Sequence, residues 1–149
     1  MAPVRNTSHW QQTAIAAFLD ETVIPVRLAC VSGSERPLVC SLWFFYDGEA
    51  IWCATKASSN VVEFLKRSPD CGFEVAPETM PYRGVRGQGK AEILPADGMQ
   101  VLERLMDRYL ETRDSEFAQW LIEQASDEVA IRIEPDWYTA WDFTDRMSR

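Results

Sequence analysis

The chain of 149 residues has a single histidine, His9, and no stretch of about 20 apolar residues that could form a membrane-spanning helix. One histidine excludes multi-histidine metal sites and argues against a Ser-His-Asp or Cys-His catalytic pair. The first ten residues also lack the apolar core of a signal peptide. We therefore expect a cytoplasmic protein with no membrane contact and no metal site.

Basic residues are scarce as well. The chain carries 15 Lys and Arg against 23 Asp and Glu, a net charge of −8, and no basic run is longer than Lys66-Arg67. This charge argues against nucleic acid as a partner. The four cysteines, Cys30, Cys40, Cys53 and Cys71, include no CxxC pair. Each lies in a predicted strand, where we expect a free thiol to act as a small buried hydrophobe.

Aromatic and β-branched residues, in contrast, gather in two short runs at 37–46 and 49–55. Between them stands Asp47-Gly48, a pair that favours the type I′ turn of a hairpin. A polar patch of Lys56, Ser58, Ser59 and Asn60 follows the second run. A short helix is predicted there, over 59–67. Free N–H groups at a helix N-terminus favour an anion. The hairpin is therefore predicted to form one wall of a ligand site with a phosphate at its end.

The remaining chain adds several strands and helices. Strands are predicted at 23–31, 71–75, 83–94, 129–133 and 138–143. Helices are predicted at 8–20, where Ser8 and Gln11 match a capping box, and at about 101–110 and 115–125. Three glycines within 83–94 indicate bulges or a close backbone approach. Six or seven antiparallel strands with short helices predict one mainly β (α+β) domain that forms a closed or nearly closed barrel.

Two arginines and one tryptophan are candidate ligand contacts. Arg83 and Arg86 present forked donors that suit a phosphate or a flavin carbonyl, although they could equally face solvent or form an interface ion pair. Trp141 stands beside Asp142 in a polar segment and could stack on a flat ligand. Most of the other aromatic residues are better explained by a core or an interface.

The order and spacing of many short segments carry a family resemblance. These segments are 27–31, 36–37, 42–44, 47–48, 54–55, Ser59, 65–69, 81–85, 89–93, 131–135 and 140–143. Over about residues 10–143 the chain resembles the pyridoxamine 5′-phosphate oxidase-like, FMN-binding split-barrel superfamily. It is most similar to the short members that bind FMN or the related deazaflavin cofactor. The resemblance implies a homodimeric split β-barrel with two flavin sites in the subunit interface.

The resemblance also implies site residues. The flavin ring would lie against the second barrel strand, at Val39, Cys40, Ser41, Leu42 and Trp43. The phosphate would bind where the next strand meets the short helix, at Thr55, Lys56, Ser58, Ser59 and Asn60. Four further residues would lie near the cofactor, some of them from the partner subunit: Arg83, Arg86, Gln88 and Trp141. Typical members carry a basic residue at the position of Val61, and Lys56 is close enough in sequence to replace it.

The function that the resemblance implies is an FMN-dependent oxidoreductase acting on a small-molecule substrate. The hydride or electron chemistry would belong to the flavin, and no side chain stands out as the catalytic proton donor. Two alternatives stay open. One is a non-enzymatic dimer that binds a flavin, a deazaflavin or haem, and the other is a member that has lost its cofactor.

Overall fold

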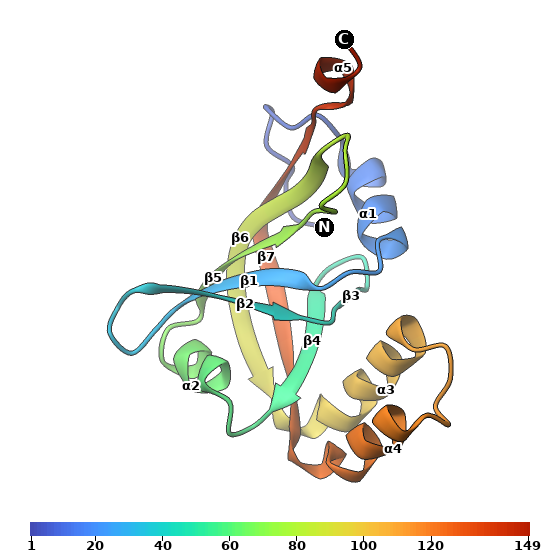
Figure 1. Ribbon diagram of the computed structural model, residues 1–149. Helices are drawn as coiled ribbons and strands as arrows, with labels where there is room; N and C mark the ends of the chain where they lie inside the picture. Colours follow the sequence, from blue (N-terminus) through green and yellow to red (C-terminus); the bar gives the residue numbers. More distant parts are fainter.

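The computed structural model describes residues 1–149 and contains seven strands, five α-helices and two short 3-10 helices (Figure 1). The strands are β1 (Val26–Val31), β2 (Pro37–Leu42), β3 (Phe45–Tyr46), β4 (Ile51–Lys56), β5 (Asp70–Val75), β6 (Arg83–Leu94) and β7 (Glu128–Asp142). The α-helices are α1 (Gln12–Glu21), α2 (Asn60–Arg67), α3 (Gly98–Tyr109), α4 (Glu116–Glu123) and α5 (Thr144–Met147). The 3-10 helices are η1 (Pro95–Asp97) and η2 (Ala125–Asp127). None of these helices has the length and apolar character needed to cross a lipid bilayer.

All seven strands join one antiparallel sheet in the order β2-β1-β5-β6-β7-β4-β3. The long strands β6 and β7 run side by side through the molecule, and α3 and α4 lie together at one end of them (Figure 1). The sheet curls into a half-barrel. The predicted fold class, a mainly β split barrel of six or seven antiparallel strands with short helices, is confirmed.

The predicted hairpin over residues 37–55 forms only in part. Strand β2 pairs with β1, at the opposite edge of the sheet from β3 and β4, and only Phe45 and Tyr46 pair with β4. The type I′ prediction is wrong, because such a turn needs positive φ at two residues and only Gly48 has it, at 97°. Instead the Asp47 carboxylate accepts hydrogen bonds from the backbone N–H groups of Glu49 and Ala50, at 2.8 and 2.7 Å.

The first helix begins at Gln12 rather than at residue 8, so the capping-box prediction is wrong. The Ser8 hydroxyl is used elsewhere, because it accepts a hydrogen bond of 2.9 Å from the backbone N–H of Ala140 in β7. This bond ties the N-terminal segment to the sheet. The barrel likewise begins at Val26, three residues later than predicted.

Strand β6 has the predicted bounds, and its glycines make close contacts with β7. A Cβ atom on Gly87 would lie 2.3 Å from the carbonyl oxygen of Trp137. The predicted strands 129–133 and 138–143 are one continuous strand, β7, although Pro135 lies within it. The ladder shifts register between Gln88 and Gly89, opposite Pro135, and proline is tolerated at such a bulge.

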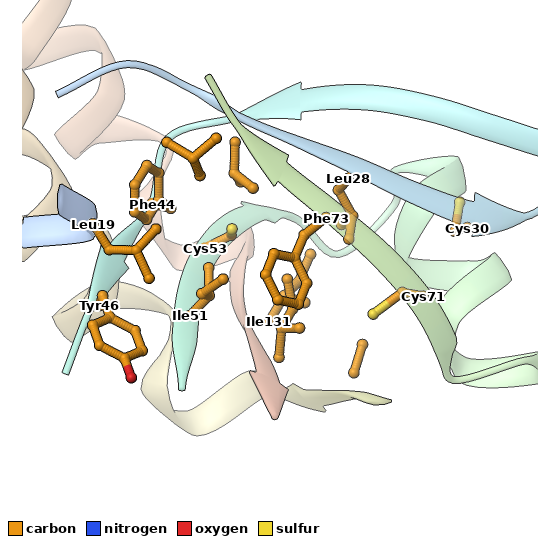
Figure 2. Packing of buried hydrophobic residues seen from close by; sticks show 14 of the residues in the cluster. Leu19, Leu28, Cys30, Phe44, Tyr46, Ile51, Cys53, Cys71, Phe73 and Ile131 are labelled. Carbon is orange, nitrogen blue, oxygen red and sulfur yellow. The ribbon is translucent and has the colours of Figure 1, made fainter. Parts of the chain in front are cut away.

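The main hydrophobic core fills the concave side of the curled sheet. It contains 22 buried residues, and Figure 2 shows Ile51, Cys53, Phe73 and Ile131 gathered at its centre. Two smaller clusters bury one face of α3 against the sheet and another against α4. Helix α3 therefore forms a layer between the sheet and α4, and this arrangement positions the site described next.

Candidate functional site

A groove of about 320 Å³ lies where the ends of β2 and β4 meet the helices α3 and α4. Its lining, which we call the α3–α4 groove, consists of Ser41, Leu42, Trp43, Ala54, Thr55, Lys56, Leu102, Leu105, Phe117, Trp120, Leu121, Gln124 and Glu128. Apolar side chains from both helices form most of one wall. The volume falls at the lower end of the range that small-molecule sites occupy, about 300–1,000 Å³.

Aromatic rings dominate one side of the groove. The ring of Trp43 is stacked on Tyr109, with 5.0 Å between centroids and 5° between planes, and meets Phe117 edge-on at 6.2 Å. Phe117 in turn stacks against Trp120 at 6.3 Å. Phe117 and Trp120 remain 50% and 48% exposed, respectively. The groove therefore offers flat, accessible aromatic surfaces of the kind that pack against a planar ligand.

The polar end of the groove holds one cation and one carboxylate. Lys56 and Glu128 are direct partners in the β4–β7 ladder, and the Lys56 ammonium donates to the Gln124 carbonyl at 3.4 Å. One carboxylate oxygen of Glu128, Oε2, is buried and has no hydrogen-bond partner. Burial raises the pKa of Glu128, the Lys56 charge opposes that rise, and Asp127 adds to it. The negative charge of Glu128 therefore opposes the positive charge of Lys56 at this end of the groove.

The start of α2 follows directly after Lys56. The Ser59 hydroxyl donates to the Lys56 carbonyl at 2.8 Å, and Ser59 precedes the first helical residue, Asn60. The first backbone N–H groups of a helix have no partner within it, so they are available to an anion. Val61, which stands at the position of the family's basic residue, is only 8% exposed and packs in the main core. Lys56 therefore precedes this helix start in the chain, while its ammonium is directed to the Gln124 carbonyl in the groove.

The groove brings together five of the residues predicted from the sequence: Ser41, Leu42, Trp43, Thr55 and Lys56. Ser58 and Ser59 lie in the turn after β4, and Asn60 begins α2, so all three adjoin the groove in the chain without lining it. Cys40 packs against the main core instead.

Three further predicted residues lie in a second cavity, on the outer face of the sheet. Val39, Arg86 and Gln88 line this hollow of about 460 Å³, which we call the sheet-face hollow. The rest of its lining is Arg27, Ala29, Gly72, Phe73, Glu74, Gly87 and Trp137. The Arg86 guanidinium lies 4.7 Å from the ring centre of Trp141. Arg83 lies at the start of β6, opposite Asp142, and belongs to neither cavity.

Sequence reasoning missed the helical part of the groove, above all Phe117, Trp120 and Glu128. The stripe of apolar residues predicted the helix over 115–125, which the structure has as Glu116–Glu123. Two of its aromatic residues are half exposed, and only the fold shows that they face the ends of β2 and β4. The signal in the sequence that could have indicated this wall of the groove is the presence of two large aromatic side chains on one short helix.

The family model for pyridoxamine 5′-phosphate oxidase matches residues 12–142. Among solved structures, the chain is similar to conserved hypothetical protein Rv2991 from Mycobacterium tuberculosis, with 25% identity and a TM-score of 0.78 over 99% of this chain and 94% of that one. It is also similar to an F420 reductase, with 25% identity and a TM-score of 0.67 over 81% and 93% of the two chains.

The haem storage protein HutZ from Vibrio cholerae shares the fold, with 18% identity and a TM-score of 0.65 over 87% of this chain and 92% of that one. Comparison with curated proteins gives no match. The family model extends from the first residue of α1 to the last residue of β7. The chain therefore belongs to the pyridoxamine 5′-phosphate oxidase family.

Proposed function

We propose that the chain, as a single cytoplasmic domain, binds a flavin-type cofactor in the α3–α4 groove and acts as an oxidoreductase on a small molecule. FMN and the deazaflavin cofactor are the two candidates. The main support for this proposal is that β2 and β4, which do not pair with each other, both end at one groove. The strand expected to hold the ring and the strand expected to hold the phosphate end at the same cavity, beneath exposed aromatic side chains.

Each part of the groove suits a part of such a ligand. Strand β2 pairs only with β1, so its other edge has free backbone N–H and C=O groups that can hydrogen-bond the polar edge of a ring. Trp43 and Phe117 offer apolar surfaces that would exclude water from the ring. Lys56 would hold an anionic tail. The bound ring would supply hydride transfer, and the side chains would orient it.

A homodimer is part of this proposal. Strand β2 is mostly exposed, with Val39 63% exposed, and an uncovered edge of this kind favours pairing with or packing against another chain. In a dimer that covers the outer face of the sheet, Arg83, Arg86, Gln88 and Trp141 would approach the groove of the partner subunit. This arrangement would bring these four residues close to the predicted residues that line the groove, from which they are separate within one chain.

Haem is the second ligand to consider, because HutZ, a haem storage protein, shares the fold. Its iron would find no imidazole in the groove, since His9 lines a different cavity with Trp10 and Asp142. The aromatic walls suit a flavin ring and a porphyrin alike. A direct comparison of ligands therefore belongs to the test.

The test is a titration of the full chain with FMN, riboflavin, the deazaflavin cofactor and haem, followed by the absorption and fluorescence of each ligand. Trp120→Ala should weaken binding of the flavin rings about 2- to 10-fold, the effect of one lost aromatic contact. Ile122→Ala is the matched control, because Ile122 is exposed on the same helix and does not line the groove. Equal affinities of Trp120→Ala and Ile122→Ala would reject the groove as the ring site.

The oxidoreductase part needs a separate measurement. A bound ring that has been reduced by light should be reoxidised by a panel of small-molecule acceptors faster than the same ring free in solution. A protein that binds the ring but never accelerates its reoxidation would support the non-enzymatic alternative.

A further inference from the structure

The polar end of the α3–α4 groove has few positive charges to offer to a ligand's tail. Lys56 is the one cation in the lining of the α3–α4 groove. The first turn of α2 adds no cation, because Val61 is buried in the core and Glu63 is the charged residue there. Any anionic tail at this end depends on Lys56 and on backbone N–H groups.

Glu128 is the neighbour of that cation in the sheet. Its partner in the β4–β7 ladder is Lys56, and residues paired in this way have their Cβ atoms about 4.5–5.5 Å apart on the same face of the sheet. Both side chains line the groove. Lys56 forms no salt bridge within 4.0 Å and donates only to the carbonyl of Gln124. The carboxylate is therefore close enough to weaken the field of the lysine without forming a salt bridge with it.

The environment of Glu128 makes this effect strong. Its Oε2 atom is buried without a partner, so solvent screens that part of the charge poorly. Asp127 precedes it, and the Asp127 carbonyl accepts a hydrogen bond of 2.8 Å from Ala57, just after Lys56. The Asp127 side chain is exposed, and its negative charge adds to the rise in the pKa of the Glu128 carboxyl. The net charge there is zero or negative.

We propose that Glu128 selects the ligand by charge, so that the polar end of the groove accepts an uncharged group or a monoanionic phosphodiester and disfavours a phosphomonoester. This inference rests on the proposed function and narrows it. A phosphomonoester carries about 1.5 to 2 negative charges at neutral pH, whereas a phosphodiester carries one and a free hydroxyl none. A dianion would leave two uncompensated charges beside the half-buried carboxylate of Glu128.

The experiment compares three ligands that have the same ring and ribityl chain: riboflavin, the methyl phosphodiester of riboflavin, and FMN. Wild-type full chain should bind FMN about 3- to 10-fold more weakly than the methyl diester, because the second charge meets Glu128 and Asp127. In Glu128→Gln the affinity for FMN should rise about 10-fold, that for the diester about 3-fold, and that for riboflavin less than about 2-fold. The gain should scale with the charge of the tail.

The control is Glu123→Gln, which makes the same change at an exposed residue at the end of α4, outside the groove lining. It should leave the order of the three affinities as in the wild type. Tighter binding of FMN than of the diester by the wild type would overturn the inference. So would an equal effect of Glu128→Gln on all three ligands, and in both cases ring binding would stand. No binding of any of the three by either protein would reject the inference and the flavin proposal together.

Discussion

The rings of Trp43 and Tyr109 lie almost parallel, 5° apart and with 5.0 Å between their centroids. The Tyr109 hydroxyl reaches past this stack to the backbone, where it lies 2.8 Å from the Ile24 carbonyl and accepts a hydrogen bond of 3.0 Å from the N–H of Phe44. One side chain of α3 thus fixes both the aromatic wall of the groove and the break between β2 and β3.

Tyr109→Phe is expected to lower the free energy of unfolding by about 1–3 kcal/mol, because the N–H of the buried Phe44 loses its partner while the ring stack is kept. Urea denaturation would measure the loss. The matched control is Tyr82→Phe, since Tyr82 is exposed and its hydroxyl makes no hydrogen bond. A loss of the same size in both variants would contradict the role given to the Tyr109 hydroxyl.

Gly87→Ala is expected to destabilise the protein by about 2–3 kcal/mol, because the new methyl group would lie 2.3 Å from the Trp137 carbonyl oxygen and 2.5 Å from the Phe73 ring. Gly72→Ala tests the same change on the neighbouring strand. A Cβ there would meet its closest neighbours at ordinary contact distances of 3.6 and 3.8 Å, so the effect should stay below about 1 kcal/mol. Equal tolerance of both variants in chemical denaturation would show that the β6–β7 contact can relax.

The stability of the protein should depend on pH through Glu128. Burial raises the pKa of this carboxyl above its ordinary value of 4.5, so the folded state binds the proton more tightly than the unfolded state does. The stability that this tighter proton binding adds to the folded state is therefore fully present below about pH 4.5, and it is lost as the pH rises through the folded-state pKa.

Glu128→Gln removes this titration. The variant should gain stability relative to the wild type at about pH 8, and the difference should vanish toward about pH 4. Free energies of unfolding in urea at several pH values would give the comparison. A difference between the two proteins that stays constant across that range would contradict a rise in the pKa of Glu128 on folding.

The cysteines should differ sharply in reactivity toward a thiol reagent. Cys40 is half buried, whereas Cys53 is fully buried, and burial raises the pKa of the Cys53 thiol well above the usual range. In the folded protein we expect Cys40 to react about 100-fold faster than Cys53, since Cys53 must wait for the structure to open. Cys40→Ser should remove the fast phase. Rapid labelling that persists in that variant would refute this order.

The sequence predicted best the elements whose signals are local. Strand β6 came out with its bounds intact, and α2 was placed within one residue, because period-two and period-3.6 patterns arise within the segment itself. The continuity of β7 was missed because a proline usually ends a strand, and Pro135 lies within this one. It is tolerated here only because Gly89 faces it at a bulge in the neighbouring strand, which no local pattern records.

In the candidate site too, the residues with a local signal were predicted and those brought in by distant contacts were not. Lys56 and Thr55 were identified from the polar residues that follow a strand, and they line the groove. The partner of β2 was not predictable from the Asp47-Gly48 signal, because strand pairing depends on contacts distant in sequence. Glu128 reaches Lys56 only through the β4–β7 ladder, across 72 positions of sequence (128 minus 56), so its effect on the lysine was hidden from sequence reasoning.

Arg108, the neighbour of Tyr109, fastens the other end of this region. Its guanidinium donates to the carbonyls of Leu19, Asp20 and Thr22 at the C-terminal end of α1, at 2.9, 2.7 and 2.9 Å. With Tyr109 bound to Ile24 and Phe44, the C-terminal turn of α3 is anchored at five backbone groups. Helix α4 lies outside this anchored turn, and its Phe117 and Trp120 are about half exposed in the groove lining, so we expect any widening of the groove to come from α4 rather than from α3.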